Sequence, residues 1–218
     1  GFLLGEHDWW GKVKMPFYNE VAHIPLFIWD PRDRVQGERR DQLVQTIDLA
    51  PTLMDYFGVE RPPDMQGLPL AATIAENAST REAIIFGIHG AHINVTDGRT
   101  IYMHAPDVDM PYFNYTLMPT HMLNYFPVDE LAPMTLSSPL SFTKGAPVLK
   151  VPVAPRTHWQ PLDTHLFDLH TSPDQTTGIT DAAVIDTMQM HIIRLMQWNN
   201  APPEMFARFG FEPPEASQ

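Results

Sequence analysis

Proline is the residue that most constrains how this chain can fold. It occurs 22 times in 218 residues, at positions spread from Pro16 to Pro214. Because proline lacks a backbone N–H and has a fixed φ, it is excluded from helix interiors and from the middle of central strands. The sequence therefore predicts short elements joined by long loops. Aromatic residues and methionines are interleaved with the prolines, so we expect these loops to be ordered.

Composition excludes several classes of partner and site. Hydrophobic residues make up 44% of the chain, which is enough for a core, and no apolar run approaches the roughly 18 residues of a membrane span. The formal net charge of -12 argues against binding to a nucleic-acid backbone. The chain has 0 cysteines, which excludes disulfides and thiolate metal sites within it. Homo-oligomerisation stays open.

In the first part of the chain a predicted strand is followed by a predicted helix. The apolar run from Ile24 to Trp29 ends at Asp30-Pro31 and is typical of a buried, central strand. A helix is predicted to begin at Asp48 as its cap and to end at Gly58. Strands alternating with helices are typical of an α/β layer, so we expect residues 1–79 to belong to an α/β domain.

The pattern of the sequence changes near residue 80, where short strand-like runs begin. Short strand-like runs are predicted over residues 83–88, 92–96, 100–104, 148–153 and 166–169, and the dipeptide Asp97-Gly98 predicts a hairpin between two of them. Residues 105–147 have little periodicity and are interpreted as a long ordered excursion. The clearest helix runs from Asp181 to Trp198, and a short helix is expected near the C-terminus. We expect residues 80–218 to form a second subdomain.

Three segments of the sequence together resemble a known family. The chain opens with Gly1, Leu4-Gly5-Glu6-His7, Gly11-Lys12, Phe17-Tyr18-Asn19-Glu20 and His23-Ile24-Pro25-Leu26. This pattern resembles the segment that follows the metal-binding Asp-His pair of sulfatases in the alkaline-phosphatase superfamily. The stretches QTIDLAPTLMDYFGV with MQGLPL, and LFDLHTSPDQTTGI, are similar to later segments of the same family.

The resemblance implies a fold and an activity. The expected fold class is α/β, the C-terminal part of an alkaline-phosphatase-like sulfatase: the edge of a large α/β sheet, plus a small antiparallel sheet packed with a C-terminal helix. The family hydrolyses sulfate esters with a formylglycine nucleophile and a divalent cation, which we expect to be Ca²⁺. The expected substrate is a sulfated small molecule or glycan.

The family nucleophile is not found in this sequence. Formylglycine is made from Cys or Ser in a Cys/Ser-x-Pro/Ala-x-Arg motif, whereas this chain has no Cys and its Ser137-Ser138-Pro139 lacks the Arg. The metal-binding pair of the family would directly precede Gly1. The resemblance thus implies a C-terminal portion of a longer hydrolase, with the nucleophile and most metal ligands outside this chain. With that N-terminus missing, bacterial cytoplasm and periplasm both stay open.

Lys12 is the residue on which the resemblance places catalysis. A fixed ammonium can stabilise the charge that builds on ester oxygens in the transition state, and lysine is a compact point charge suited to a tetrahedral oxyanion. The stretch between Lys12 and Pro25 is slightly longer than is common in the family, so Lys14 is a rival for part of this role. His7 either faces the substrate or only braces the loop.

Further candidates lie in the second half of the chain. His121, with His104 and Tyr115 as alternatives, is a candidate for contact with the organic part of the substrate. No metal site is predicted, because a set of five histidines shows no paired ligand spacing: His89, His92, His104, His158 and His165. Two other functions stay open: hydrolysis of phosphonate or phosphate esters within the same superfamily, and a non-catalytic structural module.

Overall fold

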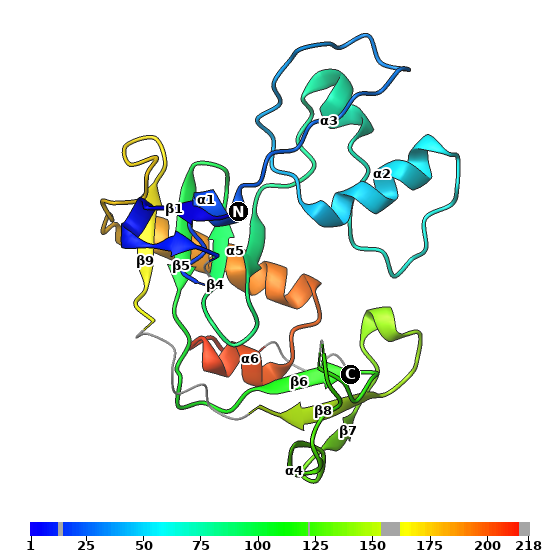
Figure 1. Ribbon diagram of the computed structural model, residues 1–218, viewed down its shortest axis with the longest axis vertical. Coiled ribbons are helices and arrows are strands. Elements are labelled where there is room, and N and C mark those ends of the chain that lie inside the picture. The colour runs from blue at the N-terminus through cyan, green and yellow to red at the C-terminus, as the bar shows by residue number, and fades with distance from the viewer. Residues whose placement is uncertain (13–14, 122, 154–161, 214–218) are drawn as a thin grey trace. The chain divides into compact units, whose positions relative to one another are not determined.

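The computed structural model describes residues 1–12, 15–121, 123–153 and 162–213 (Figure 1). The chain divides into two compact units. Unit 1 consists of Gly1–Ala105 and Asp163–Leu195, and unit 2 of Pro106–Leu162 and Met196–Gln218. The expected boundary at residue 79 concerns the catalytic domain of a longer protein, which these units do not test, so it stays a prediction.

Unit 1 is built on a four-stranded antiparallel sheet in the order β3-β4-β5-β9. Its strands are β3 (Ile84–Gly87), β4 (Ile93–Thr96), β5 (Thr100–His104) and β9 (His165–Asp168). The predicted hairpin joins β4 to β5. The Asp97 carboxylate accepts hydrogen bonds from the backbone N–H groups of Arg99 and Thr100 at 2.9 and 2.6 Å, and Gly98 supplies the positive φ of 95°. The predicted antiparallel sheet is therefore confirmed.

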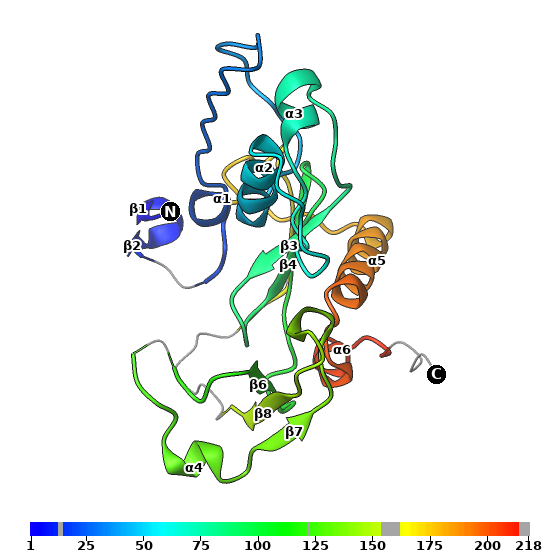
Figure 2. The same ribbon diagram turned by 90° about the vertical axis from the view of Figure 1, so that its right-hand side faces the viewer.

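Helix α5 (Ala182–Trp198) lies beside this sheet (Figure 2). The Asp181 carboxylate accepts hydrogen bonds from the N–H groups of Ala183 and Val184, as expected of a cap. The helix buries Met188 and Ile192, and its Gln189 donates a hydrogen bond to the hydroxyl of Tyr102 on β5. The sheet contributes a buried cluster of Ile101, Met103 and Phe167. Sheet and helix together form the core of unit 1.

The first 80 residues of unit 1 contain short elements only. These are β1 (Leu3–Leu4), η1 (Glu6–Asp8), β2 (Trp10–Gly11), α1 (Asn19–Ala22), η2 (Thr46–Asp48), α2 (Leu49–Tyr56) and α3 (Ala71–Glu76). Helix α2 confirms the predicted helix, which ends where Gly58 takes a φ of 65°. Asp48 does not cap it through its side chain. That carboxylate is fully buried and instead binds Arg81 and the N–H groups of Gln45 and Leu68.

The predicted strand from Ile24 to Trp29 is wrong. No described residue pairs with it, and its side chains are exposed, up to 93% for Phe27 and 78% for Trp29. A strand needs neighbours for its backbone N–H and C=O groups, and this segment finds none in the part of the chain that the structure describes. The edge of a large α/β sheet is accordingly absent from the described residues, whose sheets are small and antiparallel.

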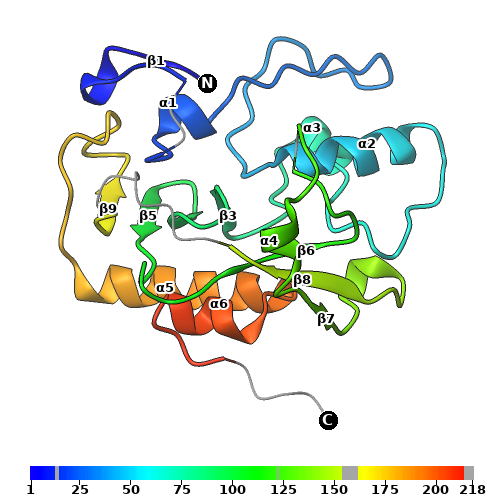
Figure 3. The same ribbon diagram turned by 60° about the horizontal axis from the view of Figure 1, so that its bottom comes forward.

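Unit 2 holds a three-stranded antiparallel sheet in the order β6-β8-β7 (Figure 3). Its elements are β6 (Phe113–Thr116), α4 (Val128–Leu131), β7 (Thr135–Ser137), η3 (Ser141–Thr143), β8 (Val148–Pro152) and α6 (Pro203–Arg208). Strand β8 and helix α6 confirm two predictions. The interpretation of residues 105–147 as an irregular excursion is only partly right, because β6 and β7 lie within it. Val151 of β8 and Phe206 of α6 are fully buried.

Within the described residues, no helix combines the length and the apolar character that crossing a bilayer requires.

Candidate functional site

The opening motif folds into a small hairpin that presents Lys12. Strands β1 and β2 pair Leu3 with Gly11 and Leu4 with Trp10. The turn between them is closed by a hydrogen bond of 3.0 Å from the Gly5 N–H to the carbonyl of Trp9. Lys12 follows β2 directly and is exposed. The hairpin therefore fixes the backbone up to Gly11 and leaves the ammonium group accessible to an anion.

The turn itself holds strained backbone. Gly5 has a φ of 121°, which only glycine adopts readily, and both His7 and Asp8 are left-handed, with φ values of 53° and 59°. The Glu6 carboxylate accepts a hydrogen bond of 2.5 Å from the Leu4 N–H, and this bond lowers the pKa of Glu6. An ionised Glu6 thus helps to close the turn.

His7 points toward helix α1. Its ring stacks on Tyr18 with centroids 3.6 Å apart and planes within 6°, and its Nε2 lies 3.6 Å from the carboxylate of Glu20. The side chain of His7 is only 8% exposed. Burial raises the pKa of Tyr18 and the nearby charge of Glu20 raises it further, so this phenol stays neutral. The contact of His7 with substrate that the sequence suggests stays a prediction.

Helix α1 is in turn attached to the loop after β9 and to the core. The N–H of Asn19 donates a hydrogen bond of 2.6 Å to the Oε1 of Gln175, which is 2% exposed. The Tyr18 ring lies 6.4 Å from that of Phe167 in the core cluster. Sequence reasoning assigned no role to Glu20 or Gln175. Both lie within the segments that carry the family resemblance, and that position was the available signal.

The two other predicted site residues lie either outside the described residues or in the other unit. Lys14 lies outside the described residues, as does His158. His121 belongs to unit 2, where its Nε2 is 2.8 Å from Glu130. Its contact with the organic part of a substrate stays a prediction. The structure therefore places His7 and Lys12 on one hairpin, and His121 in the other unit.

The two alternatives to His121 have internal partners. The Nδ1 of His104 lies 2.9 Å from the hydroxyl of Tyr102 on the same strand. In unit 2 the hydroxyl of Tyr115 donates a hydrogen bond to Glu204, which also forms an ion pair of 2.5 Å with Lys150. Burial raises the pKa of Tyr115, and the bond to Glu204 raises it further. Tyr115 is thus a neutral phenol engaged with a carboxylate.

No metal-ligating cluster is found in the described parts of the chain. No three His, Asp or Glu side chains there are grouped so that they could hold a metal ion. His92, which is 4% exposed, lies with Nε2 at 2.8 Å from the carbonyl of Asp163, and burial lowers its pKa. It is a neutral histidine in a structural contact. The described residues therefore do not fit a divalent cation.

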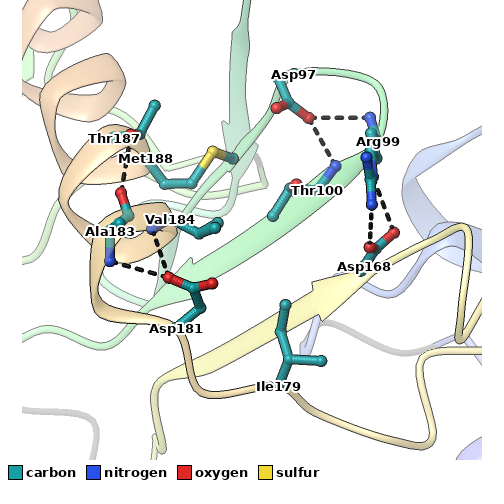
Figure 4. A pocket seen from close by; sticks show the side chains of 10 residues that line it. All are labelled: Asp97, Arg99, Thr100, Asp168, Ile179, Asp181, Ala183, Val184, Thr187 and Met188. Carbon is teal, nitrogen blue, oxygen red and sulfur yellow. Dashed lines mark hydrogen bonds and ion pairs between the residues drawn. The ribbon is translucent and has the colours of Figure 1, made fainter.

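The concave surface of unit 1 near the β4–β5 hairpin is a shallow pocket of about 410 Å³ (Figure 4). Its charged groups are already engaged. Arg99 pairs with Asp168 at 2.7 Å and lowers the pKa of that carboxyl to about 2, while Asp97 and Asp181 accept backbone hydrogen bonds. None of the predicted site residues lines this pocket, so the hairpin with Lys12 remains the candidate site.

Most of this hairpin lies in a segment that is similar to known proteins. Residues 5–95 match the model of the family N-sulphoglucosamine sulphohydrolase, C-terminal. The chain is also 38% identical over 80 residues to an N-acetylglucosamine-6-O-sulfatase of Bacteroides thetaiotaomicron. Residues 5–95 are thus similar to the C-terminal region of a sulfatase. Lys12, His7 and Glu20 all lie inside the matched range.

Other relatives of this sulfatase region are arylsulfatases. The chain is 28% identical over 138 residues to an arylsulfatase of Clostridium perfringens, and 28% identical over 104 residues to human arylsulfatase K. The matches cover 37%, 60% and 44% of this chain for the three relatives in turn. They cover only 14%, 28% and 19% of the relatives' own lengths. The chain thus spans a minor part of each whole enzyme.

A solved structure shares the fold. A protein bound to its substrate D-glucosamine-2-N,6-O-disulfate matches the whole of this chain with a TM-score of 0.56 and 19% sequence identity, over 34% of its own length. At this identity the likeness concerns the fold alone. The mixed α/β architecture of this chain, with its small antiparallel sheets and C-terminal helix, therefore matches part of the fold of that protein.

Proposed function

We propose that this chain is part of an enzyme that hydrolyses sulfate esters, and that Lys12 contributes the ammonium group that contacts the sulfate. One observation carries the proposal: the family-matched range, residues 5–95, contains the turn and second strand of the β1–β2 hairpin and the exposed lysine that follows them. The comparisons show that a segment of this chain is similar to sulfatases. The proposal adds that the whole protein has sulfatase activity.

The chemistry explains why one lysine matters. Cleavage of a sulfate ester builds negative charge on the leaving oxygen and on the non-bridging oxygens. An ammonium group held in place stabilises that charge more in the transition state than in the ground state. Because the hairpin orders the backbone before substrate arrives, little ordering remains to be done on binding.

The remaining chemistry is assigned to residues outside this chain. No cysteine is present, and no serine stands in the formylglycine motif, so the nucleophile would come from another part of the polypeptide. The same holds for the ligands of the divalent cation, since the described residues do not fit one. What this chain supplies is the ammonium group of Lys12, which binds and orients the ester.

The proposed substrate is a sulfated small molecule or glycan. The names of the relatives support sulfate over phosphonate or phosphate, because they are sulfatases that act on amino sugars or aryl esters by name. Nothing in the geometry of the hairpin favours phosphorus chemistry or a purely structural module.

The test uses steady-state kinetics of the complete enzyme. Lys12→Ala should lower the rate about a hundred- to a thousandfold, equivalent to about 2.7–4 kcal/mol, the typical loss for one oxyanion contact. Lys12→Arg should restore only part of the rate, because a planar fork replaces a point charge poorly.

Lys14→Ala is the matched control and should do much less, with melting curves confirming that all three variants fold. A damaging Lys14→Ala beside a near-neutral Lys12→Ala would refute the assignment of the lysine.

A further inference from the structure

Two buried polar atoms face each other between the hairpin turn and helix α1. The Nε2 of His7 and the Oε2 of Glu20 lie 3.6 Å apart, just beyond hydrogen-bonding distance, and neither bonds to another described residue. Buried polar groups are costly when unpaired. A slightly shorter separation would let the Nε2–H of His7 donate to the carboxylate and satisfy both groups at once. This pairing links the turn to α1.

The ring of Tyr18 fixes the plane of the His7 imidazole. It lies 3.6 Å from the His7 ring and nearly parallel to it, so the imidazole cannot tilt out of this plane without losing the stack. His7 also holds a φ of 53°, which a residue other than glycine adopts rarely. Such strain persists where the surrounding contacts determine the conformation, and it is common at functional sites.

Helix α1 is a firm support for these contacts. Asn19 is hydrogen-bonded to the buried Gln175, and the amino group of Gly1 donates a hydrogen bond of 2.8 Å to the carbonyl of Val21. In the sequence, Lys12 lies between the hairpin and helix α1: it directly follows strand β2 and it precedes α1. The hairpin before the lysine and helix α1 after it in the sequence are therefore attached to each other.

We propose that His7, Tyr18 and Glu20 form a positioning cluster that holds the hairpin in the orientation in which Lys12 meets the sulfate. The inference rests on the proposed function, because it assigns the cluster to that site. The cluster acts through Lys12 and does not touch the ester, which agrees with the 8% exposure of the His7 side chain. His7 is thus a positioning residue.

The experiment compares three variants of the complete enzyme with Lys12→Ala. His7→Phe keeps the ring stacked on Tyr18 and removes the nitrogen that faces Glu20. Glu20→Gln keeps the shape and removes the charge. Each should lower kcat about ten- to a hundredfold with little change in KM, because misplacing a catalytic group costs rate in this range. His7→Gln retains an N–H toward Glu20 and should recover most of kcat.

The matched control is His191→Phe, the same substitution on helix α5, which should leave kcat unchanged. The double variant His7→Phe/Lys12→Ala should be no slower than Lys12→Ala, because the cluster acts only through the lysine. Folded His7→Phe and Glu20→Gln enzymes with the parental kcat, beside a damaged Lys12→Ala, would overturn the cluster and leave the proposed function intact. A near-neutral Lys12→Ala would overturn both.

Discussion

Two regions of unit 1 both contain large apolar side chains but differ in how far these side chains are buried. In the sheet β3-β4-β5-β9, Met103 and Val95 are fully buried and Ile101 is 1% exposed. In residues 24–29 the most exposed of these side chains, Phe27, is 93% exposed. The sheet finds its neighbouring strands and helix α5 within the chain, whereas residues 24–29 find no partner in its described parts. An apolar run becomes core only where something covers it.

The same contrast holds for helices. Helix α5 buries Met188 and Ile192, but α2 leaves Leu53 58% exposed, with Phe57 just beyond its end 71% exposed. Exposed large apolar side chains that gather in one region mark a surface for association. The region around residues 24–57 therefore exposes apolar surface that the described residues do not cover, whereas the inner residues of the sheet are covered within unit 1.

The largest expected difference between the two regions is the loss in free energy of unfolding when a side chain is truncated. Met103→Ala should lower the free energy of unfolding by about 2–5 kcal/mol, because it opens a cavity in the core. Phe27→Ala removes a side chain that touches little and should change it by less than about 0.5 kcal/mol. Urea unfolding followed by circular dichroism at low protein concentration measures both. Equal losses would show that residues 24–29 are packed.

The next effect concerns the buried carboxylate that joins η2 to the rest of unit 1. Asp48→Asn should cost about 1.5–3 kcal/mol, the range for hydrogen bonds to charged groups. Burial by itself raises the pKa of Asp48, but the bonds from Arg81, Leu68 and Gln45 outweigh it and lower the pKa. The stabilisation is thus complete above the unfolded value of about 3.9 and is lost as pH falls through the folded value.

Unfolding free energies measured as a function of pH check this sign. The parent chain should lose stability on acidification below about pH 4, and Asp48→Asn should lose less over the same range. Identical acid profiles for the two proteins would mean that the carboxylate is not ionised in the folded state.

Substitutions in residues 24–29 should have the smallest effect on stability but a measurable effect on self-association. The purified 218-residue chain should self-associate, because residues 24–29 expose apolar side chains. Phe27→Ser and Trp29→Ser should each weaken association and leave the melting temperature nearly unchanged. Sedimentation velocity measures the change. A strictly monomeric parent chain with a sharp cooperative melt would contradict this view of the region.

Local signals in the sequence were sufficient for much of the fold. The Asp97-Gly98 hairpin, the cap at Asp181 and the helix end at Gly58 each depend on residues that are neighbours in the chain, and all three were predicted correctly. Strand β6 was missed because its ladder is formed with β8, which is distant in sequence, and β7 was missed because it is only 3 residues long. The strand over residues 24–29 was wrong because periodicity reports apolarity and not the presence of a neighbour.

The candidate site was predictable only as far as its motif. The spacing of Gly1, Gly5 and Lys12 indicated the lysine, and the structure adds the hairpin that carries it. The pairing of His7 with Glu20 and the support from Gln175 could not be predicted, because they depend on side chains brought together by folding. Sequence thus indicates the charged group, and structure indicates what holds it.

The most direct test of this account is the turnover of an aryl sulfate by the purified 218-residue chain. The account assigns a sulfate-contacting lysine to this chain, but no formylglycine motif, and no metal-ligating cluster among its described residues, so the chain by itself should show no turnover above a mock preparation. A complete arylsulfatase serves as the positive control. Turnover that exceeds the mock preparation and disappears in Lys12→Ala would contradict the account, because the chemistry would then reside within these residues.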